Sequence, residues 1–299
     1  MTTPVSSPAP SAQPQSLGTS LGVKLKTVTL RPILNLLMAV LPESAFDKFY
    51  KAAFPVYKAI SRHLYLAWNI VSLRYFSGTD GAMVQRVHKV MPYSLVGAGG
   101  LEVTDWAART VIENGVPGDM VELGVARGGC AALLGMQIAQ PAVTGRTLWL
   151  FDSYEGLPEP GDNDYVEEGD FTGDHVRPLP AGSCFGALEE VRWLLLDKCR
   201  VPEDRIEFVK GWFENTIPET KDRIGAVAVL RMDGDWYEST KISLEAFYDK
   251  VSPGGIVIID DYESCIGSKR AVDEFIAARS LPVTMEPDGR GGRWFEKSH

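Results

Sequence analysis

Residues 119–135, DMVELGVARGGCAALLG, are the stretch on which the interpretation of the whole chain depends. An apolar run ending near Glu122 passes through glycines directly into an alanine-rich segment, which predicts a buried strand, a tight turn and a helix. Glycines let a ligand approach the backbone at such a turn, and the helix N-terminus offers unpaired N–H groups. The stretch therefore predicts a strand, turn and helix that together bind a ligand.

Further short apolar runs follow this unit and alternate with helical patterns. The runs are TLWLFDS, IEFVKG, AVAVLRMDG and GIVIIDD, and helices are expected at about 183–199, 238–250 and 268–279. Such alternation predicts an α/β fold with a doubly wound, mostly parallel sheet. The closing runs LPVTMEP and RWFEK flank the turn DGRGG and predict a hairpin at one sheet edge, because a short turn joins only antiparallel neighbours. We therefore expect seven strands, the last of them antiparallel.

The N-terminal region differs from the rest in composition. Residues 1–20 contain no apolar segment typical of a secretory signal and are expected to be a disordered tail. Residues 21–85 are expected to form an N-terminal helical extension, because apolar residues such as Phe46, Phe49 and Phe54 recur at helical spacing. The extension is too often interrupted by charge to span a membrane. Homodimer formation is one hypothesis for its role, and docking on a membrane surface is another. The remaining residues, 86–299, are expected to form the ligand-binding domain.

Composition narrows the range of partners and compartments. The 299 residues carry a formal net charge of −9, and the sequence pI of about 5.1 argues against nucleic acid as a partner, because both would repel a phosphate backbone. Four cysteines lie far apart without a C-x-x-C pair, which indicates free thiols in a reducing cytoplasm.

Two acidic residues at predicted strand ends indicate the kind of ligand. Glu122 and the spacing after it differ from the dinucleotide fingerprint G-x-G-x-x-G, and an acid there would repel a pyrophosphate, so a nicotinamide dehydrogenase is disfavoured. A ligand with a cationic group and hydroxyls suits the site better. S-adenosylmethionine has both, and Asp152 is placed to accept hydrogen bonds from its ribose.

Four aspartates follow two further predicted strands. Asp233 and Asp235 lie in RMDGDWYEST, and Asp260 and Asp261 lie in IIDDYES. Ligands of open α/β sheets bind at the carboxyl ends of the strands, so these carboxylates should come within reach of one point. Like charges held that close require a counter-charge. Oxygen ligands favour magnesium or another hard divalent cation, whereas solvated loop acids or helix caps are the alternative interpretation.

Five motifs occur in order along the chain: PGDMVELGVARGG, LWLFDSYEGLPEP, VKGWFENTIPET, LRMDGDWYESTKISLEAFYDKVSPGGIVIIDDY and RWFEK. In these motifs the chain resembles the macrocin O-methyltransferase family, from about Val87 to Lys297. The region before about residue 80 is longer than that family leads us to expect. The resemblance implies a class I methyltransferase fold. It also implies an S-adenosylmethionine- and Mg²⁺-dependent O-methyltransferase acting on a hydroxyl of a sugar or a glycosylated natural product.

The resemblance also implies roles for individual residues. The implied metal ligands are Asp233, Asp260 and Asp261, and the implied general base is Asp233 or Asp235. The implied cofactor contacts are Glu122, Leu123, Gly124, Val125, Ala126, Arg127, Gly128, Asp152, Ser153, Asn215, Asp233 and Gly234. A catechol-type enzyme would be expected to carry a lysine where Trp236 stands. A phenolic acceptor and a catalytically silent cofactor-binding scaffold remain the alternatives.

Overall fold

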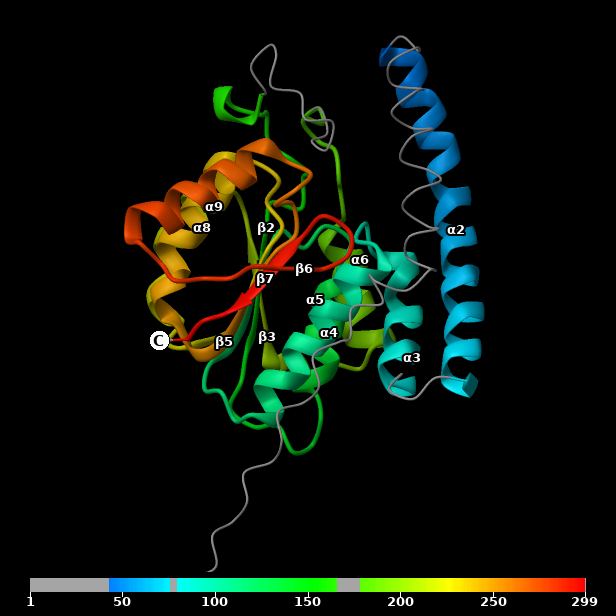
Figure 1. Ribbon diagram of the computed structural model, residues 1–299, viewed down its shortest axis with the longest axis horizontal. Coiled ribbons are helices and arrows are strands. Elements are labelled where there is room, and N and C mark those ends of the chain that lie inside the picture. Colours follow the sequence, from blue (N-terminus) through cyan, green and yellow to red (C-terminus); the bar gives the residue numbers. More distant parts are fainter. Residues whose placement is uncertain (1–42, 76–79, 166–177, 299) are drawn as a thin grey trace, which may run out of the picture.

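The computed structural model describes residues 43–75, 80–165 and 178–298. They form one seven-stranded sheet with helices packed around it (Figure 1). The strand order is β3-β2-β1-β4-β5-β7-β6. Strands β1 to β5 pair in parallel, and β7 is antiparallel to β5, which confirms the predicted doubly wound, mostly parallel sheet. The strands are β1 Asp119–Leu123, β2 Leu148–Asp152, β3 Ile206–Lys210, β4 Val227–Met232, β5 Val251–Ile259, β6 Glu286–Pro287 and β7 Arg293–Glu296.

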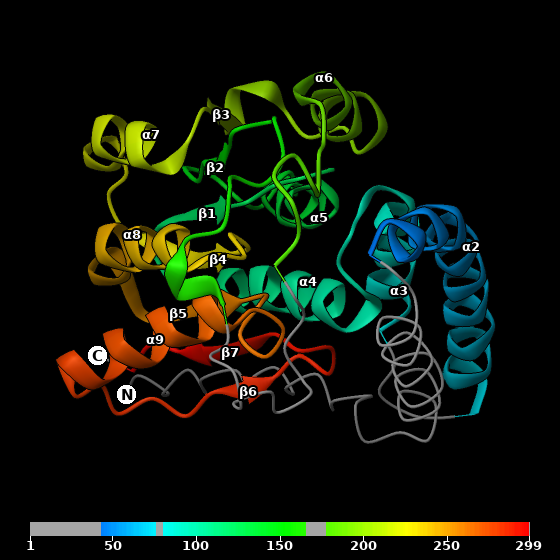
Figure 2. The same ribbon diagram turned by 90° about the horizontal axis from the view of Figure 1, so that it is seen from above.

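Helices cover both faces of the sheet (Figure 2). One face is covered by α4 Ala98–Glu113, α5 Gly129–Ile138 and α6 Leu188–Arg192. The other face is covered by α7 Phe213–Thr220, α8 Tyr237–Phe247 and α9 Ile266–Arg279. Side chains alternate between the two layers, so that Met120 packs with the first set of helices and Val121 with the second. Burial on both faces is the reason that the strands are continuous apolar runs.

Two segments differ in detail from the expected pattern. The helix expected from residue 183 begins only at Leu188 and continues as a π-helical turn, Trp193–Lys198. Gly186 before it lies so close to the turn after β1 that a Cβ atom would stand 2.0 Å from the carbonyl oxygen of Ala126. The closing hairpin is confirmed, although β6 has two residues only. Its Pro287 has no N–H to donate, which is tolerated at a sheet edge.

The N-terminal part of the described chain consists of α2 Glu43–Tyr75 and α3 Gly81–Val90. Helix α3 contributes Val84, Val87 and Val90 to the core beside α4, and α2 lies outside α3 (Figure 2). The domain boundary expected after residue 85 therefore falls inside a core helix. The expected tail, 1–20, and residues 21–42 lie outside the described residues. Within the described ranges, no helix has the length and apolar character needed to cross a membrane.

Candidate active site

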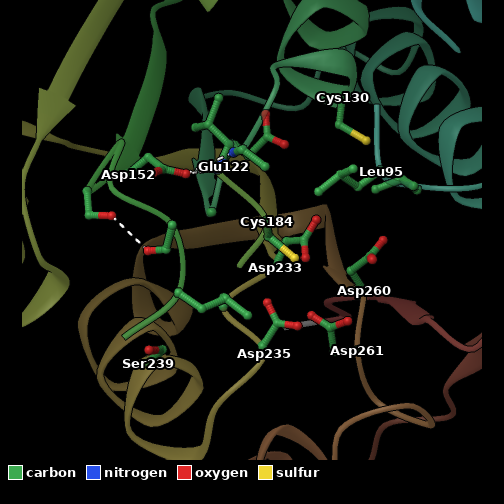
Figure 3. Close-up of a pocket in the computed structure, with 18 of the residues that line it drawn as sticks. Leu95, Glu122, Cys130, Asp152, Cys184, Asp233, Asp235, Ser239, Asp260 and Asp261 are labelled. Carbon is green, nitrogen blue, oxygen red and sulfur yellow. Dashed lines mark hydrogen bonds between the residues drawn. The ribbon is translucent and has the colours of Figure 1, made fainter. Parts of the chain in front are cut away.

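A cavity opens at the carboxyl ends of β1, β2, β4 and β5, where the sequence predicted a ligand (Figure 3). The turn after β1 forms one side of it, and the aspartates after β4 and β5 form the other. The acidic residues that line it are Glu122, Asp152, Glu214, Asp233, Asp235, Asp260 and Asp261. The fold thus brings all the predicted acids into one space.

The turn after β1 is shaped by its closeness to the end of β4. Gly124 has a φ of 88°, and a Cβ atom there would lie 1.8 Å from the backbone oxygen of Asp233. The backbone N–H of Asp233 in turn donates to the oxygen of Leu123 at 2.8 Å. Only glycine fits this position, so the turn and the β4 aspartate are held in a fixed relation.

Asp152 fastens the same turn from the end of β2. Its Oδ2 atom accepts hydrogen bonds from the backbone N–H groups of Val125 at 2.7 Å and Ala126 at 2.8 Å, and its Oδ1 atom accepts from Tyr154 at 2.6 Å. Burial raises the pKa of Asp152, and these three bonds oppose the rise. The carboxylate therefore orders the turn in addition to any contact with a ribose.

Arg231 lies at the centre of the acidic groups. It is on β4, directly beside Glu122 on β1, and its side chain is 1% exposed. Its Nη1 atom donates to Glu122 at 3.2 Å and to Asp233 at 2.9 Å, while Nη2 donates to Asp260 Oδ1 at 2.7 Å. Arg231 was not among the residues predicted from the sequence, although it is the one charged side chain in the strand VAVLRM.

A second guanidinium reaches the acid cluster from the turn between β6 and β7. The acid cluster consists of Asp233, Asp235, Asp260 and Asp261. Arg290 donates from Nη1 to Asp260 Oδ2 at 2.5 Å and lines the cavity. The sequence pattern had predicted this turn only as the connection of a hairpin. The counter-charge that the aspartates require is therefore supplied in part by the protein itself.

The aspartates remain more numerous than their cationic partners. Potential ligand atoms of Asp233, Asp260 and Asp261 lie within 4.8 Å of one another, and those of Asp235, Asp261 and Cys265 form a second such group. Figure 3 shows the carboxylates of Asp235 and Asp261 pointing toward each other. Asp261 is 6% exposed, and its buried Oδ2 atom has no hydrogen-bond partner among the described residues. The cluster thus contains a buried acceptor that no described residue satisfies.

The pKa values of these groups follow from burial and from the two arginines. Burial, followed by the charges of Asp233 and Asp260, raises the pKa of Asp235 to about 8. Burial raises the pKa of Glu122 to about 8 against the opposing effect of Arg231. Burial also disfavours ionisation of Asp260, but Arg290 and Arg231 outweigh it and hold the pKa of Asp260 below its ordinary value. Burial and mutual repulsion therefore disfavour negative charge at Glu122 and Asp235, whereas Asp260, which both arginines contact, has a lowered pKa.

Most of the residues predicted to contact the cofactor line the cavity, but three do not. Those that line it are Glu122, Gly124, Val125, Ala126, Arg127, Asp152, Ser153, Asp233 and Gly234. Leu123 is fully buried on the face of the sheet that packs against α7, α8 and α9. Gly128 is the N-cap of α5, and Asn215 is not one of the residues that line the cavity. In place of Asn215, the preceding residues Trp212, Phe213 and Glu214 of the same motif line the cavity.

The segment after β2 forms part of the cavity wall through Gly156, Leu157 and Pro158. Trp236 Nε1 donates to the carbonyl oxygen of Pro158 at 3.1 Å. Asp164 Oδ1 accepts from the backbone N–H of Tyr237 at 2.7 Å, at the start of α8. The segment after β2 is therefore hydrogen-bonded to the loop that carries Asp233 and Asp235 and to the start of α8. Residues 166–177 lie outside the described residues.

Comparison with known proteins places the chain in a family. A family described as Macrocin-O-methyltransferase (TylF) matches residues 32–297, so the family region begins well before Val87, where the sequence motifs had placed it. Demethyldecarbamoylnovobiocin O-methyltransferase of Streptomyces niveus is 39% identical over 207 residues, which cover 66% of this chain and 74% of that protein. A tetracenomycin-C 4′-O-methyltransferase of Streptomyces olivaceus is 34% identical over 220 residues, which cover 72% of this chain and 80% of that protein.

Among solved structures, the O-methyltransferase NovP superposes with a TM-score of 0.61 at 36% identity. The match covers 69% of this chain and 83% of that chain. The family match covers most of the chain, and both relatives are more than 30% identical to it. The two comparisons therefore agree. The chain belongs to the macrocin O-methyltransferase family and is an O-methyltransferase.

Proposed function

We propose that this protein transfers a methyl group from S-adenosylmethionine to a hydroxyl of a sugar or glycosylated natural product, with a magnesium ion bound at the aspartates. The observation that carries the proposal is that the glycine turn after β1, which Asp152 holds by hydrogen bonds, and the acid cluster line the same cavity. The first suits a cofactor with hydroxyls and a cationic group, and the second suits a hard cation. Relatives named for novobiocin, rhamnosyl-tetracenomycin and mycinamicin acceptors support a glycoside substrate.

The donor set fits magnesium. Asp233, Asp260 and Asp261 offer only carboxylate oxygens, at mutual distances within 4.8 Å. The buried Oδ2 atom of Asp261, which lacks a hydrogen-bond partner among the described residues, needs a ligand of this kind. Arg231 pairs with Asp233 and Asp260, and Arg290 pairs with Asp260, so Asp261 is the one of the three that neither arginine pairs with among the described residues.

The chemistry divides between the bound groups and the protein. S-adenosylmethionine supplies the methyl group from its sulfonium, and magnesium lowers the proton affinity of a hydroxyl that it binds. Asp233 or Asp235 takes the hydroxyl proton on a carboxylate oxygen. Asp152, through its bonds to Val125 and Ala126, keeps the cofactor turn fixed relative to the acids. Holding the reacting atoms in line in this way supplies much of the acceleration.

A screen with methyl-labelled S-adenosylmethionine, magnesium and a panel of glycosides tests this function. Each glycoside is paired with its aglycone and with simple phenols. Label on a sugar oxygen is the expected result. Label on phenols alone would favour the phenolic alternative, and cofactor binding without transfer to any acceptor would favour a silent scaffold.

We further propose a homodimer that uses α2. Phe49, Val56, Ile60, Leu64 and Val71 recur at helical spacing along this 33-residue helix, and each is between 42% and 58% exposed. A stripe that extends along one helix can pair with the same stripe on a second copy, as a two-fold interface requires. Sedimentation of the full chain should therefore show a dimer. A monomer that pellets with anionic vesicles would instead favour docking on a membrane surface.

A further inference from the structure

The turn between β6 and β7 is more rigid than a passive connection. Asp288 Oδ1 accepts hydrogen bonds from the backbone N–H groups of Arg290 at 2.7 Å, Gly291 at 3.0 Å and Gly292 at 2.9 Å. The backbone N–H of Asp288 donates to the oxygen of Gly292 at 3.0 Å, which closes the turn. Arg290 is thus presented from a backbone that its own loop holds in place.

The position of the turn is fixed as well. A Cβ atom on Gly99, in the first turn of α4, would lie 2.4 Å from the backbone oxygen of Asp288. One on Gly292 would lie 3.0 Å from the backbone oxygen of Asp260. Glycine at both positions lets the turn lie between the start of α4 and the end of β5. Three segments far apart in sequence therefore place Arg290 at the acid cluster.

Arg290 and Arg231 hold the two oxygens of the same carboxylate. Arg231 donates to Asp260 Oδ1 from within the sheet, where it is 1% exposed. Arg290 donates to Asp260 Oδ2 from the cavity side, where its side chain is 37% exposed. A cation bound at Asp260 from the cavity must therefore share or displace the contact with Arg290, whereas the contact with Arg231 lies behind the carboxylate.

We propose that Arg290 is a positioning residue that acts as the resident counter-charge of the acid cluster. It holds Asp260 in place while no cation is bound, and it weakens cation binding by competing for Asp260 Oδ2 and by repelling positive charge. The second part rests on the proposed metal site. The first part concerns the metal-free protein and stands independently.

The test compares Arg290→Met and Arg290→Lys with the wild-type protein. Arg293→Met is the matched control, because Arg293 lies on the same hairpin but pairs with Glu263 and not with Asp260. Manganese serves as the probe, with its affinity measured by electron paramagnetic resonance. Melting temperatures are measured in chelator and in saturating manganese.

Loss of the charge in Arg290→Met should tighten manganese binding about tenfold, because a positive charge a few ångströms away is removed. Arg290→Lys, which keeps the charge, should stay near the wild-type affinity. In chelator, Arg290→Met should melt below Arg293→Met, and saturating manganese should narrow the difference from the wild type. A variant that folds only with manganese present would support the proposal in the same way.

Unchanged or weaker manganese binding by Arg290→Met would overturn the competition with the cation. An equal loss of stability with and without manganese, or failure to fold in both, would show that Arg290 has only a structural role. If the wild type itself binds no manganese, the proposed metal site fails. The chelator measurements alone then decide whether Arg290 stabilises the cluster.

Discussion

The two halves of the cavity are stabilised in opposite ways. On the cofactor side, the carboxylate of Asp152 is satisfied by three backbone N–H groups. On the acid side, Arg231 and Arg290 face a larger number of carboxyl groups, and Asp261 keeps a buried oxygen without a hydrogen-bond partner among the described residues. This contrast is the basis of the proposal that a bound ion completes the acid half, whereas three backbone N–H groups already satisfy Asp152 on the cofactor side.

Removal of divalent cations is expected to have the largest effect, because it acts on the incomplete half. Excess chelator should abolish methyl transfer and lower the melting temperature, since an ion that binds only the folded state stabilises it. Both should return when magnesium is added back. Rates measured with a labelled cofactor and calorimetric scans provide the readout, and full activity in chelator would contradict the proposal.

Asp260→Asn should reduce the rate by at least about a hundredfold, the scale seen when one preorganised electrostatic group is removed. The shape of the side chain is nearly preserved, so the protein should stay folded by circular dichroism. Cofactor affinity should be retained, because the cofactor turn is fastened by Asp152 instead. A wild-type rate in this variant would show that Asp260 does not contribute to catalysis.

Arg231→Met tests the interior of the acid half. Removal of this guanidinium leaves Glu122 and Asp260 buried without the partner that joins them, which should cost about 3–5 kcal/mol of unfolding free energy. Urea denaturation measures the loss. Arg293→Met, which breaks a more exposed ion pair, should cost less than about 1 kcal/mol and serves as the control. Equal losses in the two variants would argue against a central role for Arg231.

Asp152→Ala tests the cofactor half and should weaken S-adenosylmethionine binding about tenfold. Each hydrogen bond to a charged group contributes on the order of 1.5–3 kcal/mol, and relaxation of the turn after the substitution recovers part of that loss. Asp119→Ala is the matched control. Asp119 also joins β1 to β2, through Thr147 and Trp149, but at the opposite end of the strands. Its removal should leave calorimetric cofactor affinity unchanged, and unchanged affinity in Asp152→Ala would refute the assignment.

The parts that sequence could predict are those set by local pattern. Strands buried on both faces are apolar runs, so β1, β2, β4 and β5 were recognisable. Because parallel strands end at one sheet edge, the meeting of Asp233 with Asp260 and Asp261 followed from their positions after β4 and β5. By the same alternation, the side chain of Leu123 faces away from that of its neighbour Glu122 and packs in the core layer of α7, α8 and α9.

The parts that sequence could not predict depend on tertiary approach. The contact of Arg290 with Asp260 joins residues 30 positions apart, through a turn whose place is set by glycines of α4. Asn215 was predicted within the motif VKGWFENTIPET, but Trp212, Phe213 and Glu214 of that motif are the residues that line the cavity, which depends on how the start of α7 is placed. Neither relation leaves a periodic signal in the chain.

The insertion of β7 between β5 and β6 has a consequence for the order of folding. The strands from β1 to β5 precede β7 in the chain, so during synthesis the outer edge of β5 emerges before the strand that covers it. An uncovered apolar edge is a template for pairing with other chains. The hairpin that brings Arg290 to the acids also closes that edge. Docking of this hairpin should therefore bring Arg290 to the acids and cover the edge of β5 in a single late step.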